Sequence, residues 1–210
     1  MVEFSDLQHT YDQQKTLSFH DWNVSHGQHG VIYGNSGSGK STLIGLISGL
    51  IQVQSGILTV CDENLKILSV DERDAFRGKN IGMVFHKPYL SRILNVYDNL
   101  AYAQQFSGKT EDDTRIFELL KEINLSDKAF SRVSEITDAE ARQIAIARAI
   151  LHSPRLILVD EPVAGLDMKE GKQIIDLLIG QAGKHEASLI IATNDIRIRD
   201  VFKNQLNLKN

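Results

Sequence analysis

A glycine-rich loop between a short apolar strand and an amphipathic helix constrains the fold of this chain more than any other feature. The apolar run Val31–Tyr33 precedes the loop, and leucine and isoleucine recur after it at i, i+3, i+4 and i+7 from Leu43 to Leu50. That spacing predicts a helix with one buried face. The loop matches the pattern G-x-x-x-x-G-K-[ST] and consists of Gly34, Asn35, Ser36, Gly37, Ser38, Gly39, Lys40 and Ser41, followed by Thr42.

The order strand, loop and helix predicts a phosphate-binding site. Glycines let the backbone turn tightly and point its N–H groups inward, and the N-terminus of a helix attracts anions. Lys40 would then reach the β- and γ-phosphates of a nucleotide, and Ser41 would give its hydroxyl oxygen to Mg²⁺. We assign the whole loop and Thr42 to the nucleotide-binding set. The alternative, a flexible Gly/Ser-rich loop, leaves the flanking strand and helix unexplained.

The rest of the chain alternates between strands and helices. The runs Leu156–Val159 and Leu189–Ala192 are apolar at every position, as expected of parallel strands covered on both faces. The first residues alternate in hydrophobicity in places, which predicts antiparallel strands with one wet face. The stretch from about Lys87 to Ile150 has helical character. We therefore expect an α/β fold: a P-loop NTPase core with a mostly parallel sheet, an N-terminal antiparallel β part and an inserted helical subdomain.

The same pattern sets the expected domain organisation. A single domain would span residues 1–210, with its core in 1–87 and 151–210 and the helical subdomain in about 88–150. The length of 210 residues suits one domain of this kind. Both parts of the core must meet in space across the insert.

Composition narrows the possible functions. The formal net charge of -4 argues against a dedicated nucleic-acid binder. Cys61 is the single cysteine, so no intrachain disulfide can form, which fits a reducing compartment. The acidic N-terminus does not read as a secretory signal, and no apolar run approaches the roughly 20 residues that span a bilayer. If the protein acts at a membrane, we expect another chain to hold it there.

A pair of acidic residues ends the apolar strand that begins at Leu156. Ligands bind at the carboxyl ends of strands in parallel sheets, so Asp160 is placed to hold Mg²⁺, directly or through water. Glu161 would orient and polarise the attacking water in a phosphoryl-transfer reaction. A solvated acidic pair at a strand end is the alternative, and the phosphate loop in the same chain disfavours it.

Four further segments follow the phosphate loop in order: Met83–Phe85, the helix Ala141–Ile150, Leu158–Pro162 and Ala164–Asp167. Together with the loop, they resemble the ATP-binding subunits of ABC transporters over nearly the whole chain. Within that family the chain is most similar to the lipoprotein-release and macrolide-export type, on the basis of Asn80–Gly82 and Asn95–Leu100.

The resemblance implies ATP and Mg²⁺ as ligands and a head-to-tail dimer, formed with itself or with a different ATP-binding subunit. ATP would lie between the phosphate loop of one subunit and the signature segment of the other. Tyr11 would stack on adenine, or else be a half-exposed strand tyrosine. Asp167 would lie at the dimer seam, or else be a solvated loop residue.

The resemblance also implies a membrane-spanning permease as partner, and a position on the cytoplasmic face of the inner or plasma membrane. No nucleic acid is expected as a partner. The permease contact is expected at Tyr89–Leu100. The apolar residues of that segment are alternatively part of the core of the insert.

Two positions of the predicted active site depart from the family pattern. His86 stands where a glutamine normally contacts Mg²⁺ and the water, and we assign it to both the metal and the catalytic sets; an ordinary loop histidine is the alternative. Asn194 replaces the switch histidine. Asparagine can hydrogen-bond the γ-phosphate or the water but cannot become cationic, and an ordinary turn residue is the alternative.

The signature segment departs as well, since it reads Ile136–Glu140. Thr137 keeps the hydroxyl that would contact the nucleotide of the partner. Asp138 and Ala139 replace the glycines that allow close backbone approach to the γ-phosphate. Thr137 and Glu140 also form a capping-box pattern, which is a competing structural explanation.

These residues predict an ATPase that converts ATP and water to ADP and phosphate. It would power a membrane transport or release complex through nucleotide-driven dimer closure, and would be slow in isolation. The alternative is an ATP-binding but weakly hydrolytic regulatory or structural subunit. A DNA-repair or chromosome ATPase would need a coiled-coil or zinc insert, and none is visible in the sequence. A P-loop kinase is disfavoured because no lid with clustered arginines is evident.

Overall fold

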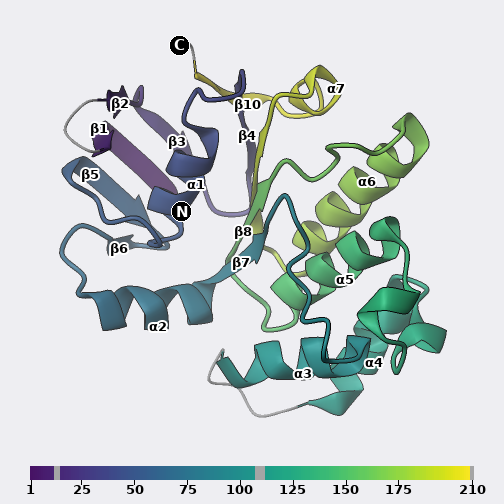
Figure 1. Cartoon of the computed structure of the whole chain (residues 1–210). Helices are drawn as coiled ribbons and strands as arrows, with labels where there is room; N and C mark the ends of the chain where they lie inside the picture. The colour runs from purple at the N-terminus through teal and green to yellow at the C-terminus, as the bar shows by residue number, and fades with distance from the viewer. Residues whose placement is uncertain (12–14, 107–111, 209–210) are drawn as a thin grey trace.

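The computed structural model describes residues 1–11, 15–106 and 112–208. At its centre is a parallel sheet with the strand order β10-β4-β9-β8-β7 (Figure 1). The strands of this sheet are β4 (His29–Gly34), β7 (Ile81–Val84), β8 (Leu156–Asp160), β9 (Ser188–Thr193) and β10 (Asn204–Leu208). The phosphate loop follows β4, and the acidic pair lies at the end of β8.

A second sheet is antiparallel and comes from the N-terminal part of the chain, as the alternation there predicted. Its strand β1 (Val2–Tyr11) pairs with three others. The remaining strands are β2 (Lys15–Ser18), β3 (Trp22–Val24), β5 (Ser55–Val60) and β6 (Glu63–Asn64). The hairpin of β1 and β2 lies on one side of the parallel sheet, with α1 between the two sheets (Figure 1).

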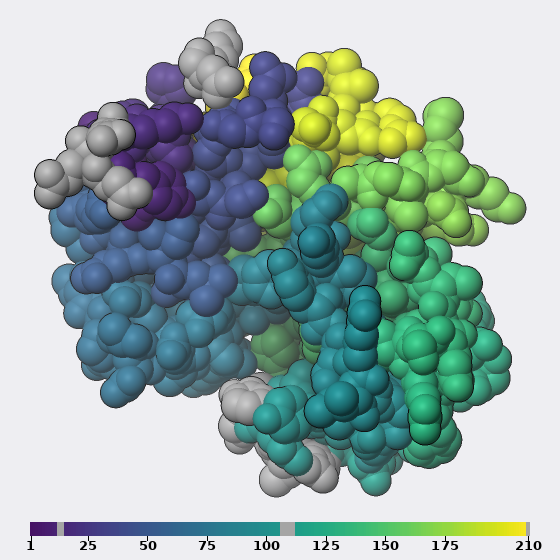
Figure 2. Space-filling view, viewed as in Figure 1, coloured from purple at the N-terminus to yellow at the C-terminus, as the bar shows by residue number. Residues whose placement is uncertain are grey.

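Helices cover both sheets. They are α1 (Lys40–Ile47), α2 (Val70–Asn80), α3 (Val96–Phe106), α4 (Asp113–Glu122), α5 (Asp138–Ile150), α6 (Met168–Lys184) and α7 (Ile196–Arg199), with short 3-10 turns η1 (Ser126–Lys128) and η2 (Val133–Glu135). In the space-filling view, the purple and blue N-terminal part and the teal and green helical part form opposite sides of the molecule (Figure 2). Among the described residues, no helix is long and apolar enough to cross a membrane.

The parallel sheet separates two hydrophobic cores, which explains why its inner strands β8 and β9 carry the unbroken apolar runs Leu156–Val159 and Leu189–Ala192. Leu156 and Leu158 face the core shared with α1 and the antiparallel sheet. Ile157 and Val159 point the other way, into the core formed with the helices α3 to α6. Successive side chains of a strand point to opposite faces, so a strand covered on both sides needs apolar residues throughout. The α/β fold class is therefore confirmed.

The helix α5 lies directly against the parallel sheet. A Cβ atom on Gly82 of β7 would lie 2.2 Å from the carbonyl oxygen of Ala149, so only glycine permits this approach. At its other end, α5 begins with a capping box between Thr137 and Glu140. The helix thus connects the predicted insert to the core, and the boundary at residue 150 stays a prediction.

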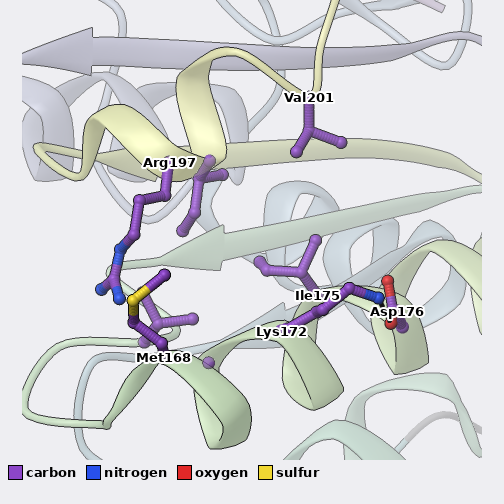
Figure 3. A pocket seen from close by; sticks show the side chains of 9 residues that line it. Met168, Lys172, Ile175, Asp176, Arg197 and Val201 are labelled. Carbon is purple, nitrogen blue, oxygen red and sulfur yellow. Dashed lines mark hydrogen bonds and ion pairs between the residues drawn. The ribbon is translucent and has the colours of Figure 1, made fainter.

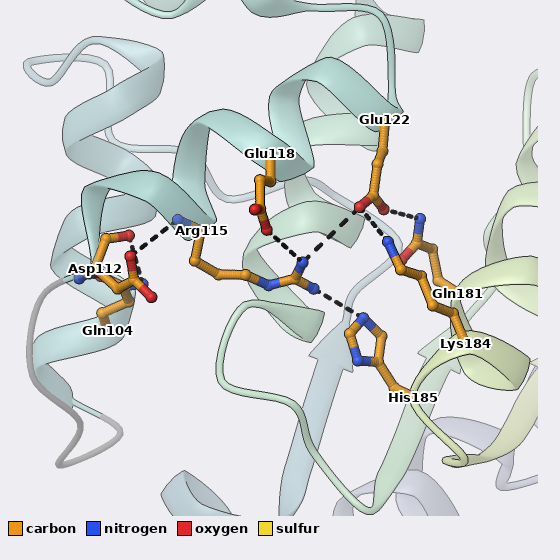
Figure 4. A network of polar contacts seen from close by, with 8 residues as sticks. All are labelled: Gln104, Asp112, Arg115, Glu118, Glu122, Gln181, Lys184 and His185. Atoms are coloured by element: carbon orange, nitrogen blue, oxygen red, sulfur yellow. Dashed lines mark hydrogen bonds and ion pairs between the residues drawn. The ribbon is translucent and has the colours of Figure 1, made fainter.

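A polar network joins α4 to the C-terminal end of α6 (Figure 4). Glu122 accepts hydrogen bonds from Gln181 and Lys184, and Arg115 lies 2.9 Å from the Nε2 atom of His185. Burial lowers the pKa of His185, and the positive charge of Arg115 adds to the effect. The neutral imidazole can therefore accept the hydrogen bond of Arg115, and the network holds the predicted insert against the core.

Candidate functional site

A polar hollow of about 460 Å³ opens beside the carboxyl ends of β4, β8 and β9. The phosphate loop forms its floor, and the hairpin of β1 and β2 forms one wall. The lining residues are Tyr11, Lys15, Leu17, Ser36, Gly37, Gly39, Lys40, Ser41, Thr42, His86, Asp160, Glu161 and Asn194. Segments that are far apart in the sequence therefore meet at the sheet edge where ligands bind in folds of this kind.

The phosphate loop has the backbone conformation that its glycines make possible. Gly37 and Gly39 have φ angles of +78° and +99°, in the left-handed region that side chains disfavour. Lys40 begins α1, and its Nζ atom donates hydrogen bonds to the carbonyl oxygens of Gly34 at 2.8 Å and Asn35 at 3.0 Å. The ammonium group is thus held across the mouth of the loop, at the N-terminus of a helix that favours anions.

Ser41 and Asp160 form a pair of oxygen donors in the same hollow. The Ser41 hydroxyl donates to Oδ2 of Asp160 at 2.7 Å, whereas Oδ1 is buried and has no hydrogen-bond partner among the described residues. Burial raises the pKa of the Asp160 carboxyl, and the negative charge of Glu161 adds to this effect. A buried carboxylate oxygen without a partner beside a hydroxyl suits a hard cation, so these residues fit Mg²⁺.

Glu161 is held at three points. Its Oε2 atom accepts hydrogen bonds from the hydroxyl of Thr193 at 3.0 Å and from the backbone N–H of Asn194 at 3.3 Å. Its Oε1 atom lies 3.4 Å from Nζ of Lys40. The φ angle of Glu161 is +49°, which is uncommon outside glycine and costs of order 1 kcal/mol or more. The surrounding contacts fix this carboxylate beside the phosphate loop.

The remaining predicted residues of the hollow lie on its walls. The Tyr11 hydroxyl is 3.0 Å from that of Thr42, and its ring packs edge-on against His9 with the centroids 4.5 Å apart. This places a half-exposed aromatic ring beside the loop. His86 and Asn194 are exposed and also line the hollow. The structure thus brings together the predicted residues that belong to one subunit.

Thr137 does not belong to this group. It is the N-cap of α5, and its hydroxyl accepts from the backbone N–H of Glu140 and donates to the Glu140 carboxylate. The capping box is therefore present, and a role of Thr137 toward a partner's nucleotide stays a prediction beside it. Asp167 likewise caps a helix, because its carboxylate accepts from the backbone N–H of Glu170 at the start of α6.

Three residues of the site were not predicted. Lys15 and Leu17 line the hollow because β2 pairs with β1, so that Lys15 lies opposite Tyr11 and Leu17 opposite His9. Their register in a hairpin with Tyr11 was the signal that could have found them. Thr193 holds Glu161 and stands one residue before Asn194, at the end of an apolar strand. Its position beside a predicted site residue was the available signal.

A second hollow, of about 300 Å³, lies between α6 and α7 (Figure 3). Its lining is largely apolar and includes Val163, Met168, Ile175, Ile198 and Val201. No residue of the phosphate loop or of the acidic pair contributes to it. An apolar lining cannot replace the water around a polyphosphate, so we place the nucleotide in the first hollow.

Comparison with known proteins identifies the class. The family described as ABC transporter matches residues 17–164, which is more than half of the chain. The chain therefore belongs to the ABC transporter family, as its motifs predicted.

Two similar proteins are ATP-binding proteins of lipoprotein-releasing systems. The chain is 33% identical over 187 residues to the lipoprotein-releasing system ATP-binding protein LolD 1 of Rhodopirellula baltica. This alignment covers 88% of this chain and 82% of the relative. It is 31% identical over 201 residues to the corresponding LolD of Buchnera aphidicola, covering 95% and 88%. The predicted similarity to the lipoprotein-release type is confirmed.

Solved structures show the same fold. A dimeric structure of the ATP-binding cassette MJ0796 in a post-hydrolysis state, bound to ADP and Pi, matches with a TM-score of 0.89 and 26% identity, covering 100% of this chain and 94% of that one. The cbiO1 protein of Clostridium perfringens, part of the transporter complex cbiONQ, matches with a TM-score of 0.88 and 25% identity, covering 99% and 84%.

Proposed function

We propose that this chain binds MgATP in the polar hollow and hydrolyses it to power a membrane transport or release complex. The observation that supports this most directly is the convergence of Lys40, Ser41, Asp160 and Glu161 at one sheet edge. They supply a cation for phosphate, two oxygen donors for a metal and a carboxylate for water. The ADP and Pi found with the MJ0796 cassette point to the same chemistry.

The chemistry assigns one task to each group. Lys40 would exchange its two carbonyl partners for oxygens of the β- and γ-phosphates. Ser41 and Asp160 would hold Mg²⁺, which supplies positive charge to the phosphate oxygens. Glu161 would orient the water and accept its proton as the water oxygen bonds to the γ-phosphorus and the bond from that phosphorus to the β–γ bridging oxygen of ATP breaks, with this oxygen leaving on ADP. Tyr11 would stack on the adenine ring. His86 would contact Mg²⁺ and the water, and Asn194 would hydrogen-bond the γ-phosphate or the water.

Partners follow from the relatives. The MJ0796 cassette is a dimer, and the LolD relatives are the ATP-binding parts of a releasing system. We infer that this chain pairs with a second ATP-binding subunit and closes on ATP, with Thr137 and Asp167 facing the nucleotide of the other subunit. A membrane-spanning permease would hold the pair at the cytoplasmic face of the inner or plasma membrane.

The segment Tyr89–Leu100 is the proposed permease contact, and only part of it is available. Val96 and Leu100 are fully buried in the core of the insert, whereas Tyr89 is 67% exposed and Ile93 is 93% exposed. Ile93→Glu should release the chain from its membrane partner, measured by co-purification from gently solubilised membranes, with MgATP affinity unchanged. Ile67→Glu, at an isoleucine 77% exposed elsewhere on the surface, is the control. Retained association of the Ile93 variant would exclude this contact.

Calorimetry on a Lys40→Ala variant tests the nucleotide site itself. We expect MgATP affinity to fall at least about tenfold, because the charged donors to the phosphates are lost. The exposed Lys172→Ala on α6 should bind as the unmodified chain does. Since Lys40 also holds two backbone carbonyls, the thermal unfolding of the Lys40→Ala variant must be compared with that of the unmodified chain. Unchanged affinity in a folded Lys40 variant would remove the assignment.

A further inference from the structure

Thr193 is the last residue of β9 and is completely buried, with 0% of its surface exposed. The strand β9 lies between β4 and β8 in the parallel sheet, and Thr193 pairs in register with Tyr33 of β4. Its neighbour Ala192 pairs with Asp160, and the carbonyl of Ala192 accepts the backbone N–H of Glu161 at 2.8 Å. The Thr193 hydroxyl is therefore fixed to the two strands that carry the catalytic groups.

The hydrogen bonds of this hydroxyl have a defined direction. Its Oγ1 atom accepts the backbone N–H of Asp195 at 3.0 Å. A hydroxyl has a single proton, and that proton is then free to point to Oε2 of Glu161, which lies 3.0 Å away. A donor to an ionised carboxylate makes a stronger contact than one between neutral groups.

The two carboxylate oxygens of Glu161 consequently have different surroundings. Oε2 is occupied by the Thr193 hydroxyl and by the backbone N–H of Asn194. Oε1 faces Lys40 at 3.4 Å, on the side of the phosphate loop. The contact from Asn194 uses its backbone, so it does not depend on which side chain stands at that position. Thr193 is thus the side chain that orients Glu161 from β9.

We propose that Thr193 is a positioning residue for the candidate base: its hydroxyl holds Oε2 of Glu161, so that Oε1 points into the hollow to accept the proton of the attacking water. The Nζ atom of Lys40 lies 3.4 Å from Oε1. When phosphate oxygens become the partners of Lys40, Oε1 is released while Oε2 stays fixed by Thr193. This inference rests on the proposed ATPase function.

Single-turnover hydrolysis and MgATP affinity of the full chain test it with Thr193→Val and Thr193→Ser. Valine keeps the shape but loses the hydroxyl, so hydrolysis should slow about 10- to 100-fold while the dissociation constant of MgATP changes less than about twofold. Serine keeps the hydroxyl and should retain most of the rate. Thr59→Val, at a strand threonine of the antiparallel sheet, is the matched control and should hydrolyse as the unmodified chain does.

A double variant separates positioning from general disturbance. In a Glu161→Gln background, Thr193→Val should slow the residual reaction no further, because Thr193 acts through the carboxylate. A Thr193→Val variant that hydrolyses normally, or one that loses MgATP affinity together with its rate, would overturn the inference while leaving the proposed function intact. Absence of hydrolysis in the unmodified chain would overturn the proposed function, and the inference with it.

Discussion

Asp160 lies at the end of β8 with Ser41 on one carboxylate oxygen and no partner among the described residues on the other. Burial disfavours its charged form, and Glu161 beside it has the same sign. A carboxylate placed in this way costs stability in the nucleotide-free protein, because desolvation of the charge is not offset by a full set of hydrogen bonds. Such a cost is understandable where the group serves a ligand, since active sites are often locally destabilising.

Replacing Asp160 by asparagine should separate these two effects. We expect Asp160→Asn to leave Tm unchanged or to raise it by a few degrees at neutral pH, where about 1 kcal/mol corresponds to ~2–4 °C for a chain of this size. The affinity for MgATP should fall at least about tenfold, because a charged metal ligand is lost. Asp127→Asn, at an exposed carboxylate of η1, should change neither quantity. A clear loss of stability in Asp160→Asn would contradict the assignment of strain to this carboxylate.

The pH dependence of the Asp160 effect has a definite sign. The folded-state pKa is raised above the ordinary value of 3.8, so the folded protein binds a proton more readily than the unfolded chain does. The stabilising contribution of protonation is therefore fully present below that ordinary value and is lost as pH rises through the folded-state pKa. The stability advantage of Asp160→Asn should accordingly shrink as pH falls toward 3.8, as measured by urea unfolding at several pH values. If the stability advantage of Asp160→Asn did not depend on pH, it could not come from the charge of the Asp160 carboxylate.

Among elements, α4 and the C-terminal end of α6 depend on the network around Glu122. Burial alone would raise the pKa of Glu122, but hydrogen bonds from Lys184 and Gln181 and the charges of Lys184 and Arg115 together hold it below its ordinary value. The carboxylate is a shared acceptor for two elements that are distant in sequence. This differs from an ion pair within one helix, which contributes little at an exposed surface.

We therefore expect Glu122→Ala to destabilise the protein by about 1–2 kcal/mol, because several partly buried donors lose their acceptor at once. Asp176→Ala is the matched comparison, since Asp176 pairs with Lys172 on the exposed face of α6. It should cost no more than about 0.5 kcal/mol. Urea unfolding of both variants provides the measurement. Equal losses in the two variants would show that the network stabilises the protein no more than an exposed ion pair within one helix does.

The elements differ in how well the sequence predicted them, for physical reasons. The strands β8 and β9 were predictable because the unbroken apolar runs Leu156–Val159 and Leu189–Ala192 have the length and composition of strands buried on both faces. The phosphate loop was predictable because its glycines and Lys40 have the spacing of a phosphate-binding loop between a strand and a helix. The contact of Thr193 with Glu161 was not, because it depends on the pairing of β8 with β9 rather than on local pattern. Lys15 entered the hollow through the register of a hairpin in the same way.

At the scale of the whole molecule, the residues proposed to bind MgATP within one chain and those expected to meet a partner differ in character. Lys40, Ser41, Asp160 and Glu161 form a connected group in the hollow. Asp138, by contrast, is an exposed residue in the first turn of α5. The capping box stabilises this end of the helix, and the helix dipole favours a negative charge there. In a head-to-tail dimer Asp138 would face a polyanion, with a repulsion of about 1 kcal/mol in water and about 4 kcal/mol at a surface-like dielectric for charges 4 Å apart.

Restoring the family residues tests how far Asp138 and the other departures from the family pattern limit ATP turnover. The combined variant Asn194→His, His86→Gln, Asp138→Gly and Ala139→Gly should hydrolyse ATP at least about tenfold faster than the unmodified chain, because one well-placed polar contact to the reacting groups is worth ~10²-fold or more. Ala139→Gly will also weaken α5 by about 1 kcal/mol, and Asp138→Gly removes a favourable charge from its first turn, so Tm should fall even as turnover rises.

Steady-state turnover and Tm are measured together, and Glu161→Gln in the restored variant should abolish the gain if that carboxylate activates the water. If the unmodified chain is already as fast as the restored one, the departures are tolerated variation. The weakly hydrolytic regulatory alternative is then excluded, and Asp138 serves the start of α5 without cost to dimer closure. A restored variant that stays slow while binding MgATP would favour the regulatory subunit instead, because recovery of the altered contacts would not have recovered catalysis.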